Sequence, residues 1–380
     1  MPRLADVLRQ YAPEYLERFG AETTADQRRV LRAIMSCRTG ELGSVFYACP
    51  SCGHAHVIAR GCGNRHCPSC QADKARAWLE RETERLLPCP YFLVTFTLPE
   101  SLRELARRRP RQLYTALFDE SAAALKKLAA DPKHIGTRRP GFFGVLHTWG
   151  RDAIYHPHLH YVVPGGGLSD DARNWLPSRA DFFVPVRALS KIFRAKFRAA
   201  MQRAGLIDRI DPAVWRADWV VHSKAVGDGR ASVKYLAPYV FRVAISDRRI
   251  LSCDGGKVVF AVKRSGSPRY RPMTLDAMEF IRRFLAHVLP RGFMKLRHYG
   301  FLSSNPGVPG GIEAVRWLVS LYYELDFWLR ASPLVVAASP PRVRCPSCGG
   351  PMLCRGFLPP EYRPIERPRD VALAEFFDSS

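Results

Sequence analysis

Apolar residues recur at helical spacing in several stretches of this chain. Near the amino terminus, the apolar residues at this spacing are Val7, Leu8, Tyr11, Tyr15, Val30, Leu31 and Ile34. The same period of about 3.6 residues recurs over the longer stretches 101–130, 187–203 and 275–289. Each of these stretches is predicted to be a helix, and Ser101 is a suitable N-cap for the first of the three.

Other stretches have the composition of β-strands. Short runs rich in β-branched and aromatic residues occur at 91–98, 144–149, 155–164, 215–222, 243–245 and 258–263. Strands and helices alternate along the chain without a glycine-rich nucleotide-binding loop. We therefore predict an α+β fold with a predominantly antiparallel sheet, helices on a face of it, and the 155–164 strand at its centre.

Three histidines are concentrated in the run Tyr155–Pro164 (YHPHLHYVVP). Successive side chains of a strand point to opposite faces, so His156, His158 and His160 should share one face, about 7 Å apart in pairs. A lone histidine is more often a core or surface residue with satisfied hydrogen bonds than a metal ligand. Because three of the chain's 11 histidines lie within five positions, this strand instead predicts a site for one divalent metal ion.

Two tyrosines about 75 positions further on, Tyr235 and Tyr239, should lie one turn apart on the same face of a helix. Lys234 and Arg242 flank them as candidate DNA-binding cations. Pro238 is tolerated only in the first turn of a straight helix, so we expect the helix to begin near residue 232 or to be kinked. Tyrosines at this spacing are commonly core aromatics, but a nearby metal ion makes them candidate nucleophiles.

The cysteines indicate zinc binding rather than disulfide formation. The count of 11 is odd, and two Cys-x-x-Cys pairs have fourteen residues between them. That spacing is typical of a ribbon in which two such pairs hold one structural Zn²⁺. The expected zinc ligands are Cys49, Cys52, Cys67 and Cys70.

Further cysteines leave the zinc ligands open. Cys37, Cys62 or His66 could replace one ligand, and Cys62 with His66 could serve a second ion. A third pair, Cys345–Cys348, lies with Cys354 near the carboxyl terminus and lacks an evident fourth ligand nearby. It could bind zinc with a ligand from elsewhere or bind none.

The charge balance points to a polyanionic partner. Lys and Arg number 58 against 35 Asp and Glu, which gives a net charge of +23, and such a surplus most often marks nucleic-acid binding. Arg65, beside the second cysteine pair, is a candidate DNA contact. The chain shows neither a run of about 18 apolar residues nor a signal-peptide pattern. We therefore expect no membrane partner and a cytoplasmic location, which also suits the cysteine pattern.

The histidine strand and the tyrosine pair together resemble a known family. His158-Leu159-His160 matches the His–hydrophobic–His signature of HUH single-strand endonucleases, and Tyr235 with Tyr239 matches their two-tyrosine subclass. Over residues 25–305 the chain is similar to the rolling-circle transposases of bacterial insertion sequences. The matching blocks, in the family's order, are 92–99, 145–150, 155–167, 235–246 and 279–300.

The resemblance implies an enzyme that nicks single-stranded DNA at element ends. Tyr235 or Tyr239 would attack the phosphodiester, leaving a 5′-phosphotyrosine and a free 3′-OH. The resemblance also implies Mg²⁺ or Mn²⁺ at the histidines. Because Pro157 can tilt the neighbouring His156 away, His147 or a nearby carboxylate is an alternative third ligand. At positions 237–238 the sequence has Ala-Pro where the family has Gly-Arg, which removes a phosphate-binding cation.

The expected domain order follows from the motifs and the resemblance. Residues 1–88 would form a helical, zinc-ribbon DNA-binding domain and residues 89–305 the HUH nuclease domain. Residues 306–380 would hold a helix and a partly loose Cys-x-x-Cys tail. An HUH replication initiator or relaxase would share this chemistry, although the amino-terminal ribbon favours the transposase. A non-catalytic zinc-dependent DNA-binding protein would explain the charge and the ribbon, but not the histidine strand beside a tyrosine pair.

Overall fold

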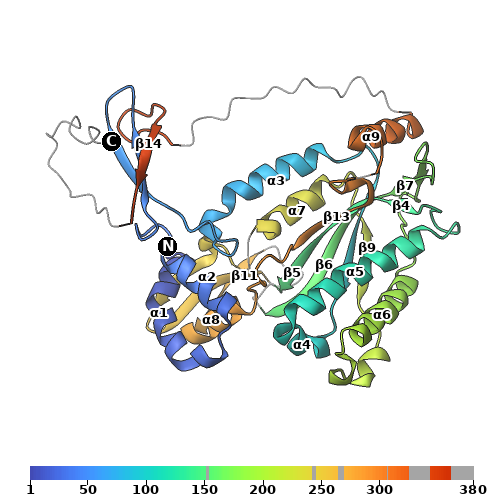
Figure 1. Ribbon diagram of the computed structural model, residues 1–380, viewed down its shortest axis with the longest axis horizontal. Coiled ribbons are helices and arrows are strands. Elements are labelled where there is room, and N and C mark those ends of the chain that lie inside the picture. Colours follow the sequence, from blue (N-terminus) through green and yellow to red (C-terminus); the bar gives the residue numbers. More distant parts are fainter. Residues whose placement is uncertain (151–153, 242–244, 264–268, 306, 325–342, 361–380) are drawn as a thin grey trace. The chain divides into compact units, whose positions relative to one another are not determined.

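The computed structural model describes residues 1–150, 154–241, 245–263, 269–305, 307–324 and 343–360 (Figure 1). The chain divides into two compact units. The first contains residues 1–32 and 63–334, and the second contains residues 33–62 and 335–380. Each unit is built from two separate stretches of the chain.

A five-stranded sheet forms the centre of the first unit, in the order β13-β5-β6-β3-β9. Its strands are β3 (Tyr91–Thr97), β5 (Phe142–Trp149), β6 (Tyr155–Pro164), β9 (Val221–Ala225) and β13 (Leu296–Tyr299). All four pairings between neighbouring strands are antiparallel. The predicted α+β class with an antiparallel sheet is therefore confirmed, and the histidine strand β6 is its middle strand.

One face of this sheet packs against α5 (Pro110–Ala129) and α6 (Val186–Arg203). Phe96 of β3 and Leu159 of β6 are fully buried there with apolar side chains of both helices. Figure 1 shows α5 and α6 together on this side of the sheet. The alternation along β6 therefore leaves the histidines on the opposite face.

The opposite face packs against α3 (Ala72–Glu84), α7 (Arg230–Phe241) and α9 (Gly311–Tyr322). Val145 of β5 and Val162 of β6 are buried beneath these helices. Helices α3 and α7 run beside each other (Figure 1). The face that carries the histidines is thus the face on which α7, the helix with the tyrosine pair, is packed.

The long helix expected over residues 101–130 is divided by a proline. Helix α4 (Arg103–Arg108) ends just before Arg109, and α5 begins at Pro110. Arg109 has φ −130° and ψ 54°, outside the helical region, because the ring of a proline disfavours the helical conformation for the residue before it. The prediction of α6 over 187–203 is confirmed within one residue.

The strand expected over residues 215–222 is wrong for most of its length. Residues Pro212–Trp215 form a 3₁₀ helix, and β9 begins only at Val221. Trp219 is buried because its ring packs edge-on against Phe193 and Phe197 of α6, with 5.2 Å between centroids in each pair. Its hydrophobicity therefore reflects helix contact rather than strand pairing. The strand expected at 243–245 falls largely on residues outside the described part of the chain.

A separate antiparallel sheet in the first unit joins β10 (Ile250–Asp254), β11 (Lys257–Lys263) and β12 (Tyr270–Asp276). The expected strand at 258–263 corresponds to β11. Helix α8 (Ala277–Leu285) packs beside β11 and β12 and against α1 (Leu4–Phe19). It is shorter than the predicted 275–289 helix at both ends. The Asp276 side chain caps its start by accepting the Met278 backbone N–H, and the helix ends at Leu285.

The remaining elements of the first unit are short. Strands β4 (Arg139–Pro140), β7 (Gly166–Leu168) and β8 (Trp175–Pro177) form a small antiparallel sheet. Helix α2 (Ala25–Met35) begins in the first unit and ends in the second. Among the described residues, no helix is long and apolar enough to cross a membrane.

The second unit contains a three-stranded antiparallel sheet in the order β14-β1-β2. Strands β1 (Ser44–Ala48) and β2 (Ala55–Ala59) form a hairpin, and β14 (Leu353–Leu358) pairs with the free edge of β1. A segment near the carboxyl terminus thus completes a sheet begun near the amino terminus. No pattern in the sequence predicts this pairing.

Candidate active site and cysteine clusters

Three histidines from two neighbouring strands form a cluster in the first unit. His147 of β5 lies directly opposite His158 of β6, and His160 of β6 lies directly opposite Thr95 of β3. The ligand nitrogens of His147, His158 and His160 all lie within 4.8 Å of one another. This arrangement brings together two of the three predicted histidines and adds one from the adjacent strand.

His156 is replaced by His147 in the cluster. The Nδ1 atom of His156 is 2.9 Å from Nη2 of Arg103 on α4, so this ring is held at the end of the strand beside a cation. The prediction of a set made from His156, His158 and His160 is corrected on this point. The cause is strand register, because β5 places His147 across from His158.

Hydrogen bonds fix the orientation of both clustered histidines on β6, His158 and His160. His158 Nδ1 donates to the backbone carbonyl of His156 at 2.7 Å. Because a carbonyl oxygen can only accept, the neutral ring keeps its Nε2 lone pair available for a ligand. His160 Nδ1 is 2.9 Å from the Thr95 hydroxyl. In metal sites, a hydrogen bond to the ring nitrogen that does not bind the ion orients the histidine ligand in this way.

Burial keeps these imidazoles neutral. It lowers the pKa of His158 to about 4 and the pKa of His160 to about 3. Burial, followed by the nearby His160 and His158, also lowers the pKa of His147 well below its ordinary value. Metal ions bind the neutral imidazole. Three neutral, oriented and mutually close imidazoles are a donor set that fits one divalent transition-metal ion.

Helix α7 brings Tyr235 beside this cluster. The Tyr235 ring lies edge-on to His160, with 6.1 Å between centroids and an angle of 87° between planes. Val233 and Leu236 are fully buried against the core and anchor the helix, whereas 48% of Tyr235 is exposed. The phenol ring is therefore next to the histidines and accessible to a macromolecular substrate. Lys234 is exposed on the same helix.

The second predicted tyrosine, Tyr239, also lies on α7, one turn after Tyr235. Its side chain, that of Pro238 and all of Arg242 fall outside the described residues. Helix α7 begins at Arg230, close to the expected start. Pro238 is therefore beyond the first turn, where it has no N–H to donate to the carbonyl of Lys234.

The predicted set of four zinc ligands is divided between two clusters. Cys49 and Cys52 lie with Cys345 and Cys348 in the second unit, and the four Sγ atoms are all within 4.8 Å of one another. The carboxyl-terminal pair thus supplies the ligands that the sequence could not place. The expected pairing of Cys49 and Cys52 with the 67–70 knuckle is corrected.

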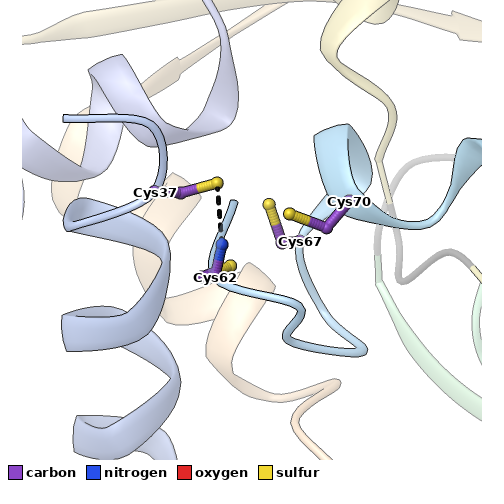
Figure 2. A group of neighbouring side chains, drawn as sticks. All are labelled: Cys37, Cys62, Cys67 and Cys70. Carbon is purple, nitrogen blue, oxygen red and sulfur yellow. Dashed lines mark hydrogen bonds between the residues drawn. The ribbon is translucent and has the colours of Figure 1, made fainter. Parts of the chain in front are cut away.

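The other predicted pair, Cys67 and Cys70, lies with Cys37 and Cys62 (Figure 2). These Sγ atoms also lie within 4.8 Å of one another. The backbone N–H of Cys62 donates to Cys37 Sγ at 3.4 Å. Both alternative cysteines considered from the sequence are therefore used, and each cluster has the four thiols of a closed structural zinc site.

Two neighbouring residues have structural contacts instead of the expected roles. His66 is buried, and its Nε2 accepts the backbone N–H of Leu289 at 3.1 Å while Nδ1 is 3.1 Å from Asn64 Oδ1. Both ring nitrogens are therefore engaged. Arg65 donates from Nη1 to the Phe293 carbonyl at 2.5 Å, and burial lowers its pKa. This contact does not support the prediction that Arg65 binds DNA.

Two residues of the histidine site, Thr95 and His147, are not among the main site residues predicted from the sequence. Thr95 gave no signal beyond its place in a predicted strand. His147 lay within a block that matched the family, and it was considered only as an alternative ligand. Both became identifiable through the pairing of β3 and β5 with β6.

Comparison with known proteins agrees with these features. Residues 7–98 match a family model described as "Transposase zinc-binding domain", and residues 141–308 match one described as "Putative transposase". The second match contains the three clustered histidines and both tyrosines. The first contains six of the eight clustered cysteines, all but Cys345 and Cys348. No solved structure matches the chain.

Two curated relatives cover most of the chain. The protein named "Putative transposase y4qJ" from Sinorhizobium fredii is 41% identical over 325 residues, which are 80% of this chain and 81% of the relative. The "Transposase for insertion sequence element IS801" from Pseudomonas savastanoi pv. phaseolicola is 29% identical over 293 residues, 72% of this chain and 69% of the relative. The chain therefore belongs to the IS91-type family of insertion-sequence transposases, with the family's zinc-binding domain at its amino terminus.

Proposed function

We propose that this transposase nicks single-stranded DNA at the ends of its element, with Tyr235 as a nucleophile. The observation that carries the proposal is the place of the half-exposed Tyr235 ring, edge-on to His160 of a three-histidine cluster. If Tyr235 were only a core aromatic, this would explain its helical spacing from Tyr239. It would not explain why the phenol ring is exposed beside three oriented imidazoles.

The proposed step is an in-line displacement at phosphorus. The Tyr235 phenol loses its proton to solvent and its oxygen bonds to phosphorus, while the bond from phosphorus to the 3′ oxygen breaks. The leaving 3′ oxygen takes up a proton and becomes a 3′-OH, and the 5′ phosphate stays on the tyrosine. Attack of a 3′-OH on this phosphotyrosine reverses the step, so strands are rejoined without a nucleotide cofactor.

His147, His158 and His160 are the residues that would hold the divalent cation. When bound, a divalent cation neutralises charge on the non-bridging phosphate oxygens. Of the two ions that the family resemblance implies, Mn²⁺ fits three nitrogen donors better than Mg²⁺, which prefers oxygen ligands. Thr95 and the His156 carbonyl would keep the rings in place, as they do in the structure.

Basic residues support a single-stranded DNA substrate. The net charge of +23 favours binding to a polyanion, and Lys234 is exposed next to the nucleophile. Positively charged residues leading to the site can bind the flexible backbone of single-stranded DNA, whatever its base sequence. Arg242 and Tyr239 remain proposed contributors, Arg242 to DNA binding and Tyr239 as a second nucleophile in rolling-circle transposition.

The test is a covalent-adduct assay with a labelled single-stranded oligonucleotide from an element end and Mn²⁺. Wild-type protein should form an adduct that survives denaturation, and Tyr235→Phe should form much less. Tyr270→Phe is the matched control, because Tyr270 is exposed and lies on β12, outside the site. Equal adduct formation by Tyr235→Phe and wild type at all time points would rule out Tyr235 as a principal nucleophile.

A further inference from the structure

The second unit contains two knuckles of identical sequence. Residues 49–53 and residues 345–349 both read Cys-Pro-Ser-Cys-Gly. The 67–70 knuckle shares Cys-Pro-Ser-Cys but continues with Gln71, which precedes helix α3. The first knuckle and the carboxyl-terminal one are therefore alike over all five residues, whereas the 67–70 knuckle shares only the first four.

The two knuckles also have the same backbone geometry. Gly53 and Gly349 both have φ +72°, a conformation that glycine adopts readily. The Gly53 N–H donates to the Cys49 carbonyl, and the Gly349 N–H donates to the Cys345 carbonyl, each at 2.9 Å. This shared turn directs the two thiols of each knuckle to one side, as in zinc ribbons.

The thiols of the two knuckles face each other at distances that suit a metal ion. Cys49 Sγ is 3.5 Å from Cys348 Sγ, and Cys52 Sγ is 3.5 Å from Cys345 Sγ. A disulfide needs about 2.05 Å. Zn–S bonds of about 2.3 Å in a tetrahedron place sulfur atoms about 3.8 Å apart. The observed separations are close to the tetrahedral value.

Contacts around the knuckles hold this arrangement. Strand β1 ends at Ala48, immediately before Cys49, and Ala48 pairs with Leu353 at the start of β14. Ser347 Oγ of one knuckle is 3.1 Å from Nδ1 of His54, which follows the other. Cys49, Cys345 and Met352 are buried together. The second knuckle is thus joined to the first by a strand pairing and by side-chain contacts as well as by its thiols.

We propose that Cys49, Cys52, Cys345 and Cys348 bind a second structural Zn²⁺, distinct from the ion of the Cys37, Cys62, Cys67 and Cys70 cluster. This ion joins residues 293 and 299 positions apart in sequence. It makes the carboxyl-terminal segment part of the zinc-binding region, beyond the match at residues 7–98. The proposal concerns structure and metal content and does not depend on the nuclease chemistry.

Thiol alkylation of the full-length, zinc-loaded protein tests the proposal without any substitution. Cys52, Cys348 and Cys354 are all exposed, so Cys354 is an internal control for burial. Peptide mass spectrometry should find Cys52 and Cys348 unmodified while Cys354 is alkylated. After a strong chelator is added, all three should react. Alkylation of Cys348 as fast as Cys354 before chelation would overturn the proposal.

Measuring the zinc content of cysteine variants identifies which thiols share the ion. The double variant Cys345→Ser/Cys348→Ser should contain one zinc equivalent less than the Cys354→Ser control. Adding Cys49→Ser and Cys52→Ser should remove no further zinc, because all four thiols bind the same ion. Unchanged zinc in the first variant, or loss of a second equivalent in the combined variant, would contradict a shared site. If the variants do not fold, the alkylation result on the wild-type protein decides.

Discussion

His147 on β5 lies directly opposite His158 on β6, and their imidazole rings stand edge to face with 5.2 Å between centroids. This single cross-strand pair turns a two-histidine motif into a cluster of three histidines. The motif supplies His158 and His160 from alternate positions of one strand, and the antiparallel register supplies the third ring. The following predictions depend on this geometry and on the α7 helix beside it.

The identity of the third ligand can be tested by comparing two histidine variants. His147→Ala should reduce Mn²⁺-dependent cleavage of a single-stranded oligonucleotide by about 100-fold or more, because it removes a proposed metal ligand. His156→Ala should leave cleavage little changed, since its ring contacts Arg103. Cleavage is measured from initial rates on a gel, with circular dichroism as the control for folding. The opposite order of the two variants would restore His156 as the ligand.

The Thr95 hydroxyl should tune metal affinity without taking part in cleavage. Thr95→Val removes its contact with His160 Nδ1 and should weaken Mn²⁺ binding by about 10- to 100-fold, with cleavage recovered at high Mn²⁺. Thr95→Ser keeps the hydroxyl and should behave like the wild type. Mn²⁺ binding is measured by electron paramagnetic resonance. A loss of cleavage that no Mn²⁺ concentration restores would show that Thr95 does more than orient His160.

Both tyrosines of α7 should be needed for a full transposition cycle. One helical turn separates Tyr235 from Tyr239, so either phenol could reach the same bound phosphate through a modest shift of the DNA. Tyr235→Phe and Tyr239→Phe should each abolish transposition in cells, since phenylalanine keeps the ring and removes only the oxygen. Normal transposition by Tyr239→Phe, with none by Tyr235→Phe, would identify a one-tyrosine enzyme.

The buried histidines should make folding sensitive to acid. In the folded state burial lowers the pKa of His158 to about 4 and of His160 to about 3, whereas the unfolded state has values near 6.5. Below about pH 6.5 the unfolded chain therefore binds more protons, and the free energy of unfolding falls as pH falls. The expected loss is at most about 1.4 kcal/mol per pH unit for each histidine, and it ends for His158 near pH 4.

Urea unfolding between pH 7.5 and 5, without added divalent metal, measures this effect. The His158→Gln/His160→Gln variant is the control, because it retains both cysteine clusters and their own response to acid. The wild type should lose more stability than the variant over this range. Parallel curves for the two proteins would mean that these rings titrate normally in the folded state.

The sequence by itself determined the features that depend on local order along the chain. Period-2 alternation placed His158 and His160 on one face of a strand, helical spacing placed Tyr235 and Tyr239 one turn apart, and proline and glycine marked many of the boundaries. The Cys-x-x-Cys knuckles are local as well, because both thiols belong to one turn. These signals, with the family motifs, were sufficient for the fold class and the transposase family.

Only the tertiary structure decided which distant elements meet. Strand register brought His147 and Thr95 to the β6 histidines, and the edge pairing of β14 with β1 brought Cys345 and Cys348 to Cys49 and Cys52. A cysteine pair carries no record of its partner, since each knuckle offers the same two thiols wherever it folds. The nearest knuckle in sequence was therefore the wrong partner, and the choice was made by hydrogen bonding between β1 and β14, which pairs Ala48 with Leu353.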